Sequence, residues 1–185
     1  MNIIINPDNL TPNEHWQKFY KVRAIVENNN GEFAISSEGG KAIFPGGKQK
    51  DNENSIDAIK RELKEELGID FEPSDFIKVL DLETLYSSFY DYRTDSYKPR
   101  YTKTIYYYVK CNQEINAKNM HLTEGEIKEG FKVSFVDVHT LLRLLSEDHS
   151  QAKNGKYFDE ENRTVIENIL KSEILSANVR FRKPY

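Results

Sequence analysis

Residues 47–69 read GKQKDNENSIDAIKRELKEELGI, and this stretch decides the fold of the chain. Asn54 is a residue type that often caps the start of a helix, and Asp57 follows three positions later, close to a capping box. Gly68 comes directly after the apolar Leu67, where a glycine commonly ends a helix. The sequence therefore predicts a helix of about three and a half turns between Asn54 and Gly68.

The predicted helix carries an apolar stripe and an acidic stripe. At roughly 100° per residue, four apolar residues fall on one side, where they can pack against a core. These residues are Ile56, Ile59, Leu63 and Leu67. Glu62, Glu65 and Glu66 form a second side with only the small Ala58 among them, and the basic residues point elsewhere.

The acidic stripe needs a physical reason. Glu62 and Glu66 are four residues apart, and like charges at this spacing weaken a helix. A solvated helix face, the ordinary explanation for several glutamates, would mix in cations. Clustered carboxylates are what a hard divalent cation binds, and Mg²⁺ often shares them with substrate phosphates. We therefore interpret the stripe as a site for Mg²⁺, with Mn²⁺ as the alternative cation.

The stretch as a whole resembles the Nudix box. Its residues fit the pattern G-x5-E-x7-R-E-U-x-E-E-x-G-U, where U is apolar, at every constrained position. A looser resemblance extends over residues 18–145. It implies a Nudix-type hydrolase, an Mg²⁺-dependent enzyme that cleaves a diphosphate linkage in a nucleoside diphosphate derivative by attack of water on phosphorus.

The resemblance also implies roles for residues around the helix. In similar proteins the carbonyl just before the box glycine, here that of Gly46, joins the glutamates of the stripe as a metal ligand. On spacing alone, Arg61 reaches Glu65 or, across the loop, Glu53, and the resemblance favours orientation of Glu53. Glu62 is the candidate general base.

A further carboxylate is expected from outside the helix. Similar proteins often bring one more acidic residue to the metals from a loop late in the domain, which corresponds here to residues 122–130 (LTEGEIKEG). Glu124, Glu126 and Glu129 are the candidates. The resemblance favours Glu126, which lies several positions before the next strand, and Gly125 frees the backbone beside it.

The remaining chain predicts an α/β fold. Strands are predicted at residues 19–27, 32–36, 41–44, 76–85, 102–110 and 131–136, and helices at 138–147 and 159–175. Such elements form layers of helix on a sheet, and the resemblance implies an α/β/α sandwich with a mixed sheet and an extra C-terminal helix. We expect a Nudix domain at residues 1–150. After a linker at 150–157, residues 151–185 form a helical extension of the same domain with a short basic tail at 178–185.

Residues 86–101 (YSSFYDYRTDSYKPRY) are rich in aromatic side chains and carry Arg93 and Arg100. Such a segment can stack on a nucleobase and hold phosphates, so both arginines are candidate substrate contacts. Tyrosines are equally common at the tip of a long β-hairpin or in the interface between two subunits. The sequence leaves these alternatives open, and a homodimer with them.

Composition limits the other functions. The formal net charge of −4 gives no general nucleic-acid-binding surface, and the partner we expect is a small molecule. Cys111 is the only cysteine, so the chain has no internal disulfide and fits a reducing compartment. No apolar run approaches the roughly 18 residues of a membrane span, and the N-terminus lacks the pattern of a signal peptide. The expected location is the cytoplasm.

Two other functions of this fold stay open. One is a sensor that binds a nucleotide without hydrolysing it, although a sensor has no need of every glutamate in the stripe. The other is isomerisation of prenyl diphosphates, whose enzymes use a histidine-rich metal site and a catalytic cysteine, and Cys111 is poorly placed for that role. The box reads the diphosphate rather than the attached group. ADP-ribose, dinucleoside polyphosphates, nucleotide sugars, nucleoside triphosphates and capped RNA therefore all remain compatible.

Overall fold

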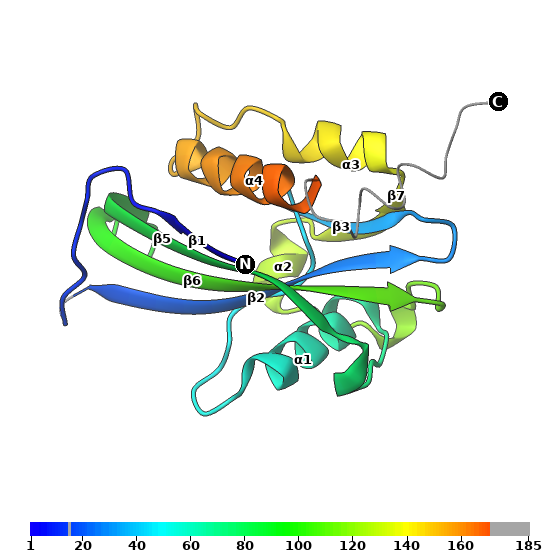
Figure 1. Cartoon of the computed structure of the whole chain (residues 1–185). Coiled ribbons are helices and arrows are strands. Elements are labelled where there is room, and N and C mark those ends of the chain that lie inside the picture. The colour runs from blue at the N-terminus through cyan, green and yellow to red at the C-terminus, as the bar shows by residue number, and fades with distance from the viewer. Residues whose placement is uncertain (15, 171–185) are drawn as a thin grey trace.

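Seven strands form one mixed β-sheet that lies between helices (Figure 1). The computed structural model describes residues 1–14 and 16–170. The strands are β1 (Asn2–Ile5), β2 (Gln17–Asn28), β3 (Phe33–Glu38), β4 (Lys41–Ile43), β5 (Ile77–Asp91), β6 (Ser96–Cys111) and β7 (Lys132–Val136). Their order is β1-β5-β6-β2-β3-β4, and β7 pairs with β3. The β1–β5 and β2–β6 pairs are parallel, whereas the other pairs are antiparallel.

Helices cover both faces of this sheet, which confirms the predicted α/β/α sandwich (Figure 1). The helices are α1 (Ser55–Leu67), α2 (Glu124–Lys128), α3 (Val138–Leu145) and α4 (Gly155–Leu170), with 3₁₀ turns η1 (Pro73–Asp75) and η2 (Ala117–Asn119). α1 packs on one face, and α3 and α4 pack side by side on the other. Each face has its own buried apolar cluster.

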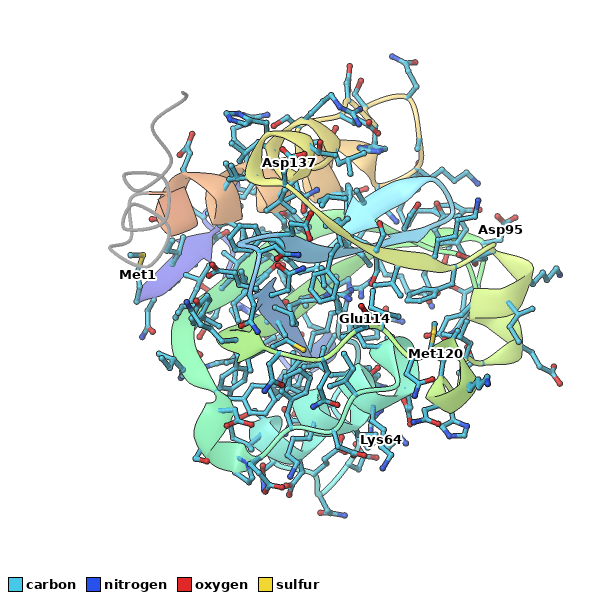
Figure 2. All side chains as sticks on the ribbon, turned by 90° about the vertical axis from the view of Figure 1, so that its right-hand side faces the viewer. Met1, Lys64, Asp95, Glu114, Met120 and Asp137 are labelled. Carbon is cyan, nitrogen blue, oxygen red and sulfur yellow. The ribbon has the colours of Figure 1, made fainter. Side chains whose placement is uncertain are left out.

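The helix predicted from residues 47–69 forms at the expected place. The Asn54 side chain accepts a hydrogen bond from the backbone N–H of Asp57 at 2.9 Å. Gly68 ends the helix in the left-handed conformation, with φ of 68°. Leu63 and Leu67 are completely buried. Figure 2 shows Lys64 on the outer side of α1, away from the side chains that fill both sides of the sheet.

Strand β2 serves both layers because successive side chains point to opposite faces. Val22 and Ala24 are completely buried in the cluster under α1, whereas Ile25 belongs to the cluster under α3 and α4. By the same alternation, Lys21 and Arg23 lie on the face covered by α4. One strand therefore supports the box helix and supplies cations to the opposite layer.

The structure corrects several boundaries. Residues 86–101 mostly belong to a long β5–β6 hairpin, one of the alternatives that the sequence left open, in which Leu85 pairs with Tyr101 and Tyr90 with Tyr97. Cross-strand aromatic pairs of this kind stabilise a sheet and extend both strands beyond the predicted ends.

Other elements also differ from the prediction. Residues 2–5 form an unpredicted strand, which pairs with β5. α4 begins at Gly155, inside the predicted linker at 150–157. The last residues of the predicted helix 159–175 and the tail at 178–185 lie outside the described residues. None of the described helices is both long and apolar enough to cross a membrane.

Candidate active site

The acidic stripe of α1 faces the inside of the domain. Glu62 is 8% exposed and Glu66 is 4% exposed, whereas the side chain of Glu65 is 35% exposed. A solvated helix face would leave these carboxylates in water, so the ordinary explanation for a glutamate run does not hold here. Buried carboxylates are costly unless they are paired, and their partners therefore decide what this face can do.

Arg61 is the centre of a charged network beside the stripe. Its Nε and Nη2 atoms donate to the two carboxylate oxygens of Glu53, at 2.8 and 2.9 Å. Its Nη1 atom donates to Glu62 at 2.7 Å and to Glu65 at 3.1 Å. Arg61 lowers the pKa of Glu53 to about 2. Both contacts that the spacing allows are made, and Arg61 holds three carboxylates in fixed positions.

Glu66 lies at the buried end of the stripe. Its carboxylate accepts hydrogen bonds from the Ser36 hydroxyl and from the Gly46 backbone N–H, each at 3.2 Å. Burial raises the pKa of Glu66 to about 8, although the charge of Arg23 and the Gly46 N–H oppose this rise. Burial also raises the pKa of Glu62, against the opposing effect of Arg61. Both side chains are thus buried acids that a nearby cation would return to the charged form.

The two adjacent glycines of the loop before α1, Gly46 and Gly47, are required by close packing. A Cβ atom on Gly47 would come within 2.5 Å of a Glu62 carboxylate oxygen. Gly46 has φ of 129°, and a Cβ atom there would collide with the backbone carbonyl of Val22. The loop backbone can therefore run directly against the carboxylates of α1, as a shared ligand site demands.

The metal ligands implied by the sequence do not converge on one point as a complete coordination shell would. Among residues 1–14 and 16–170, no three acidic, histidine or cysteine side chains converge closely enough to hold a metal ion. The hydrogen bonds explain why: Glu62 and Glu65 are turned toward Arg61, and Glu66 is turned toward the Gly46 backbone. The donor set still suits a hard divalent cation, because it offers buried carboxylates of raised pKa next to a carbonyl-rich loop.

Arg23 is a contact that the sequence reasoning missed. Its Nη1 atom donates to the carbonyl oxygens of Phe44, at 3.0 Å, and of Gly46. Its charge also opposes the rise in pKa that burial causes at Glu62 and Glu66. Arg23 therefore lies between the sheet face under α4 and the acidic stripe of α1. The signal was present in the sequence, since cations occupy alternate positions of the predicted strand.

A pocket of about 390 Å³ opens on the same sheet face, and we call it the hairpin pocket. It is lined by side chains from β2, β4, β5, β6 and the start of α4. Four cations face it, against two carboxylates. The cations are Lys21, Lys41, Arg93 and Arg100, and the carboxylates are Asp91 and Glu161. The pocket thus has the aromatic and cationic character expected of residues 86–101.

The two arginines predicted as substrate contacts both line the hairpin pocket, but in different ways. Arg93 is exposed in the β5–β6 turn. The guanidinium carbon of Arg100 lies 3.9 Å from the ring centre of Phe19 and 4.2 Å from that of Phe89. Arg100 is therefore held against two aromatic faces, whereas Arg93 lies exposed in the turn.

Glu126, the favoured outside carboxylate, has a different local partner. The predicted acidic loop contains the short helix α2. Glu126 completes the capping box of this helix, accepting hydrogen bonds from the Thr123 N–H at 2.6 Å and from the Thr123 hydroxyl at 2.8 Å. A helix turn forms here because Thr and Glu three residues apart satisfy its first N–H groups. The described contacts do not join Glu126 to the glutamates of α1.

The family model of the NUDIX domain matches residues 17–158. The chain belongs to the Nudix family, whose members hydrolyse diphosphate bonds and generally use divalent cations. A comparison with curated protein sequences gives no match.

A solved structure supports the same fold. A MutT protein from Bacillus halodurans superimposes with a TM-score of 0.53 at 16% identity, over 84% of this chain and 84% of that chain. A MutT protein from Methanosarcina mazei Go1 gives 0.49 at 18% identity, over 81% and 99% of the two chains. At 16% identity the likeness to the Bacillus halodurans protein concerns the fold alone.

Proposed function

We propose that this Nudix protein is an Mg²⁺-dependent pyrophosphohydrolase that acts on a nucleoside diphosphate derivative. The observation that carries the proposal is the burial of Glu62 and Glu66 against the glycine loop, with Arg61 and Glu53 beside them. Buried carboxylates destabilise the folded state when no cation is bound, because burial disfavours their charged form. Their arrangement is therefore better explained by function than by stability.

The residues would divide the work as follows. Gly46, Glu62, Glu65 and Glu66 would hold the cation, which when bound neutralises phosphate charge and lowers the pKa of a water. Glu62 remains our candidate for accepting the proton of the attacking water. Arg61 would keep the carboxylates oriented, and Glu53 fixes Arg61 through two hydrogen bonds.

The hairpin pocket would receive the organic part of the substrate. Lys21 lines this pocket and pairs through its backbone with Lys48, which directly follows the box glycine. Arg23 lies two residues further along β2 and contacts the Gly46 carbonyl. A nucleotide with its base in the pocket can therefore extend its phosphates along β2 toward α1, past cations that attract phosphate oxygens.

We also propose that the reaction takes place in the cytoplasm, since a chain with a single cysteine fits a reducing compartment.

Cys111 also bears on the isomerase alternative. It is buried, and its thiol exchanges hydrogen bonds with Gln113. Burial raises the pKa of this thiol, which keeps it unreactive and does not favour an isomerase that needs a catalytic cysteine.

A phosphate-release screen tests the activity. Purified protein is incubated with ADP-ribose, dinucleoside polyphosphates, nucleotide sugars, nucleoside triphosphates and capped RNA, each with Mg²⁺ and with EDTA. We expect hydrolysis of at least one compound in Mg²⁺ and none in EDTA. Binding without hydrolysis across the panel would favour the sensor instead.

A further inference from the structure

The hairpin pocket holds two partly buried charges of opposite sign that do not form an ion pair. Arg100 projects into it from β6 and Glu161 from α4, and the two do not close an ion pair with each other. Burial lowers the pKa of Arg100 and raises the pKa of Glu161, while each charge also acts on the other. Buried opposite charges usually pair, since separate desolvation is costly. The gap between them indicates space for a ligand group.

Arg100 is prepared to donate hydrogen bonds. The rings of Phe19 and Phe89 hold its guanidinium from both sides, and its Nε atom donates to the Thr102 hydroxyl at 3.2 Å. Its two terminal nitrogens make no hydrogen bond to the described part of the chain. A flat guanidinium fixed in this way offers a two-pronged donor at little entropic cost.

Glu161 is the acceptor that remains for a ligand. The other carboxylate of the pocket, Asp91, is already engaged by Gln17 at 3.1 Å, by Lys98 at 3.5 Å and by the Thr94 hydroxyl. Lys21, Arg100 and Arg23 face Glu161 and favour its charged form. The Thr84 hydroxyl also favours the charged form of Glu161. This hydroxyl is buried and makes no hydrogen bond of normal geometry among the described residues.

The N-terminal end of α4 is anchored to the β5–β6 hairpin by hydrogen bonds and ring stacking, and this contact positions Glu161. The Asn154 side chain accepts from the Tyr90 N–H at 2.7 Å and donates to the Tyr90 carbonyl at 2.9 Å. Tyr157 stacks on Tyr86 with ring centres 4.0 Å apart. Glu161 itself lies just beyond residues 17–158, which match the family model.

We propose that the hairpin pocket is a guanine site, in which Glu161 accepts from the N1–H and N2–H₂ donors and Arg100 donates to the acceptors on the opposite edge. Among the common bases, guanine alone offers two adjacent donors to match both oxygens of one carboxylate, together with the O6/N7 acceptor pair that arginine binds bidentately. Phe158, which also lines the pocket, adds an aromatic face. This proposal rests on the proposed function, because it assigns the nucleoside of that substrate.

Calorimetric titration with GMP, IMP and AMP in EDTA tests the site without any turnover. IMP lacks only the 2-amino group, and a site built to hydrogen-bond that group should bind IMP about tenfold more weakly. We expect Glu161→Gln to remove the preference for GMP over IMP. Arg100→Lys should weaken both nucleotides alike, since lysine cannot lie flat between two rings. Glu167→Gln, on an exposed position of α4, is the matched control and should bind as wild type does.

Two results would overturn the guanine site. One is equal affinity of the wild-type protein for GMP, IMP and AMP, which needs no variant and hence no assumption about folding. The other is an unchanged preference for GMP in Glu161→Gln protein whose thermal melt matches that of wild type. No hydrolysis is expected in EDTA, so the calorimetric titration and the phosphate-release screen are independent. A negative titration leaves the result of the screen valid, and a negative screen leaves the base preference measurable.

Discussion

The acidic stripe of α1 and the hairpin pocket under α4 are assembled in opposite ways. The stripe comes from one continuous stretch, in which a single helix sets the positions of Glu62, Glu65 and Glu66. The pocket draws its side chains from separate segments of the chain, between Gln17 and Glu161. Local periodicity fixes the first, whereas strand pairing and the docking of α4 fix the second. The residues that we propose for the chemistry are therefore close in sequence, whereas those that we propose to select the substrate are brought together by tertiary structure.

Neutralising the stripe should give the largest effect. We expect Glu65→Gln and Glu66→Gln each to lower kcat by roughly 100-fold or more, because each removes a charged cation ligand. Stability without metal should hold or rise, most clearly for Glu66→Gln, because glutamine removes a buried acid whose charged form is disfavoured in the folded state. Steady-state kinetics and thermal melts in EDTA measure both. Lys64→Gln, on the outer side of the same helix, should leave kcat unchanged. Melting far below wild type in EDTA would give these glutamates a structural role.

Removing a pocket arginine should act on binding rather than on chemistry. Arg100→Ala should raise KM for the best substrate about tenfold with kcat less affected, because a fixed donor is lost. Arg93→Ala should raise KM less, since Arg93 is exposed in the turn. An unchanged KM, together with a shift from dimer to monomer on a sizing column, would instead assign the hairpin to a subunit interface.

Replacing Glu126, the candidate carboxylate from outside α1, should have an effect of similar size on kcat rather than on KM. If Glu126 leaves its cap and joins the acidic stripe during turnover, Glu126→Gln should lower kcat at least roughly tenfold. Glutamine at this position can preserve the capping box, so the fold of α2 should survive the change. Glu129→Gln is the control and should do almost nothing. Full kcat in Glu126→Gln would leave Glu126 as a helix cap and turn attention to Glu124.

The smallest effect concerns pH and metal-free stability. The pKa of Glu66 rises to about 8 in the folded state, so between its ordinary pKa and about 8 the folded protein binds more protons than the unfolded chain. The free energy of unfolding should therefore fall as pH rises through this window in EDTA. Glu66→Gln should make this dependence shallower, as urea denaturation at several pH values would reveal. Identical slopes in the two proteins would mean that Glu66 is charged throughout.

The sequence was informative wherever one element decides the outcome. Asn54, Gly68 and the apolar spacing predict α1 because capping and periodicity act within a few residues. The hairpin was harder, since aromatic and polar residues at 86–101 suit a loop and a strand alike until pairing between β5 and β6 selects the strand.

The parts of the candidate site that the sequence did not reveal also depend on contacts between segments that are distant in the sequence. Arg23 matters because it contacts the Gly46 carbonyl, which lies 23 residues away in the sequence. Glu161 gains its importance because Asn154 ties the start of α4 to the backbone of Tyr90. Neither relation has a local signature, because both depend on how distant segments pack.

The central claim is that the buried carboxylates of α1 hold a divalent cation on which turnover depends. Isothermal titration of Mg²⁺ into wild-type protein and into Glu66→Gln, followed by a hydrolysis assay of each in Mg²⁺ and in EDTA, tests it most directly. We predict Mg²⁺ binding and turnover in wild type, loss of turnover in EDTA, and loss of both properties in Glu66→Gln. Equal Mg²⁺ binding by the two proteins, or undiminished hydrolysis in EDTA, would contradict the account.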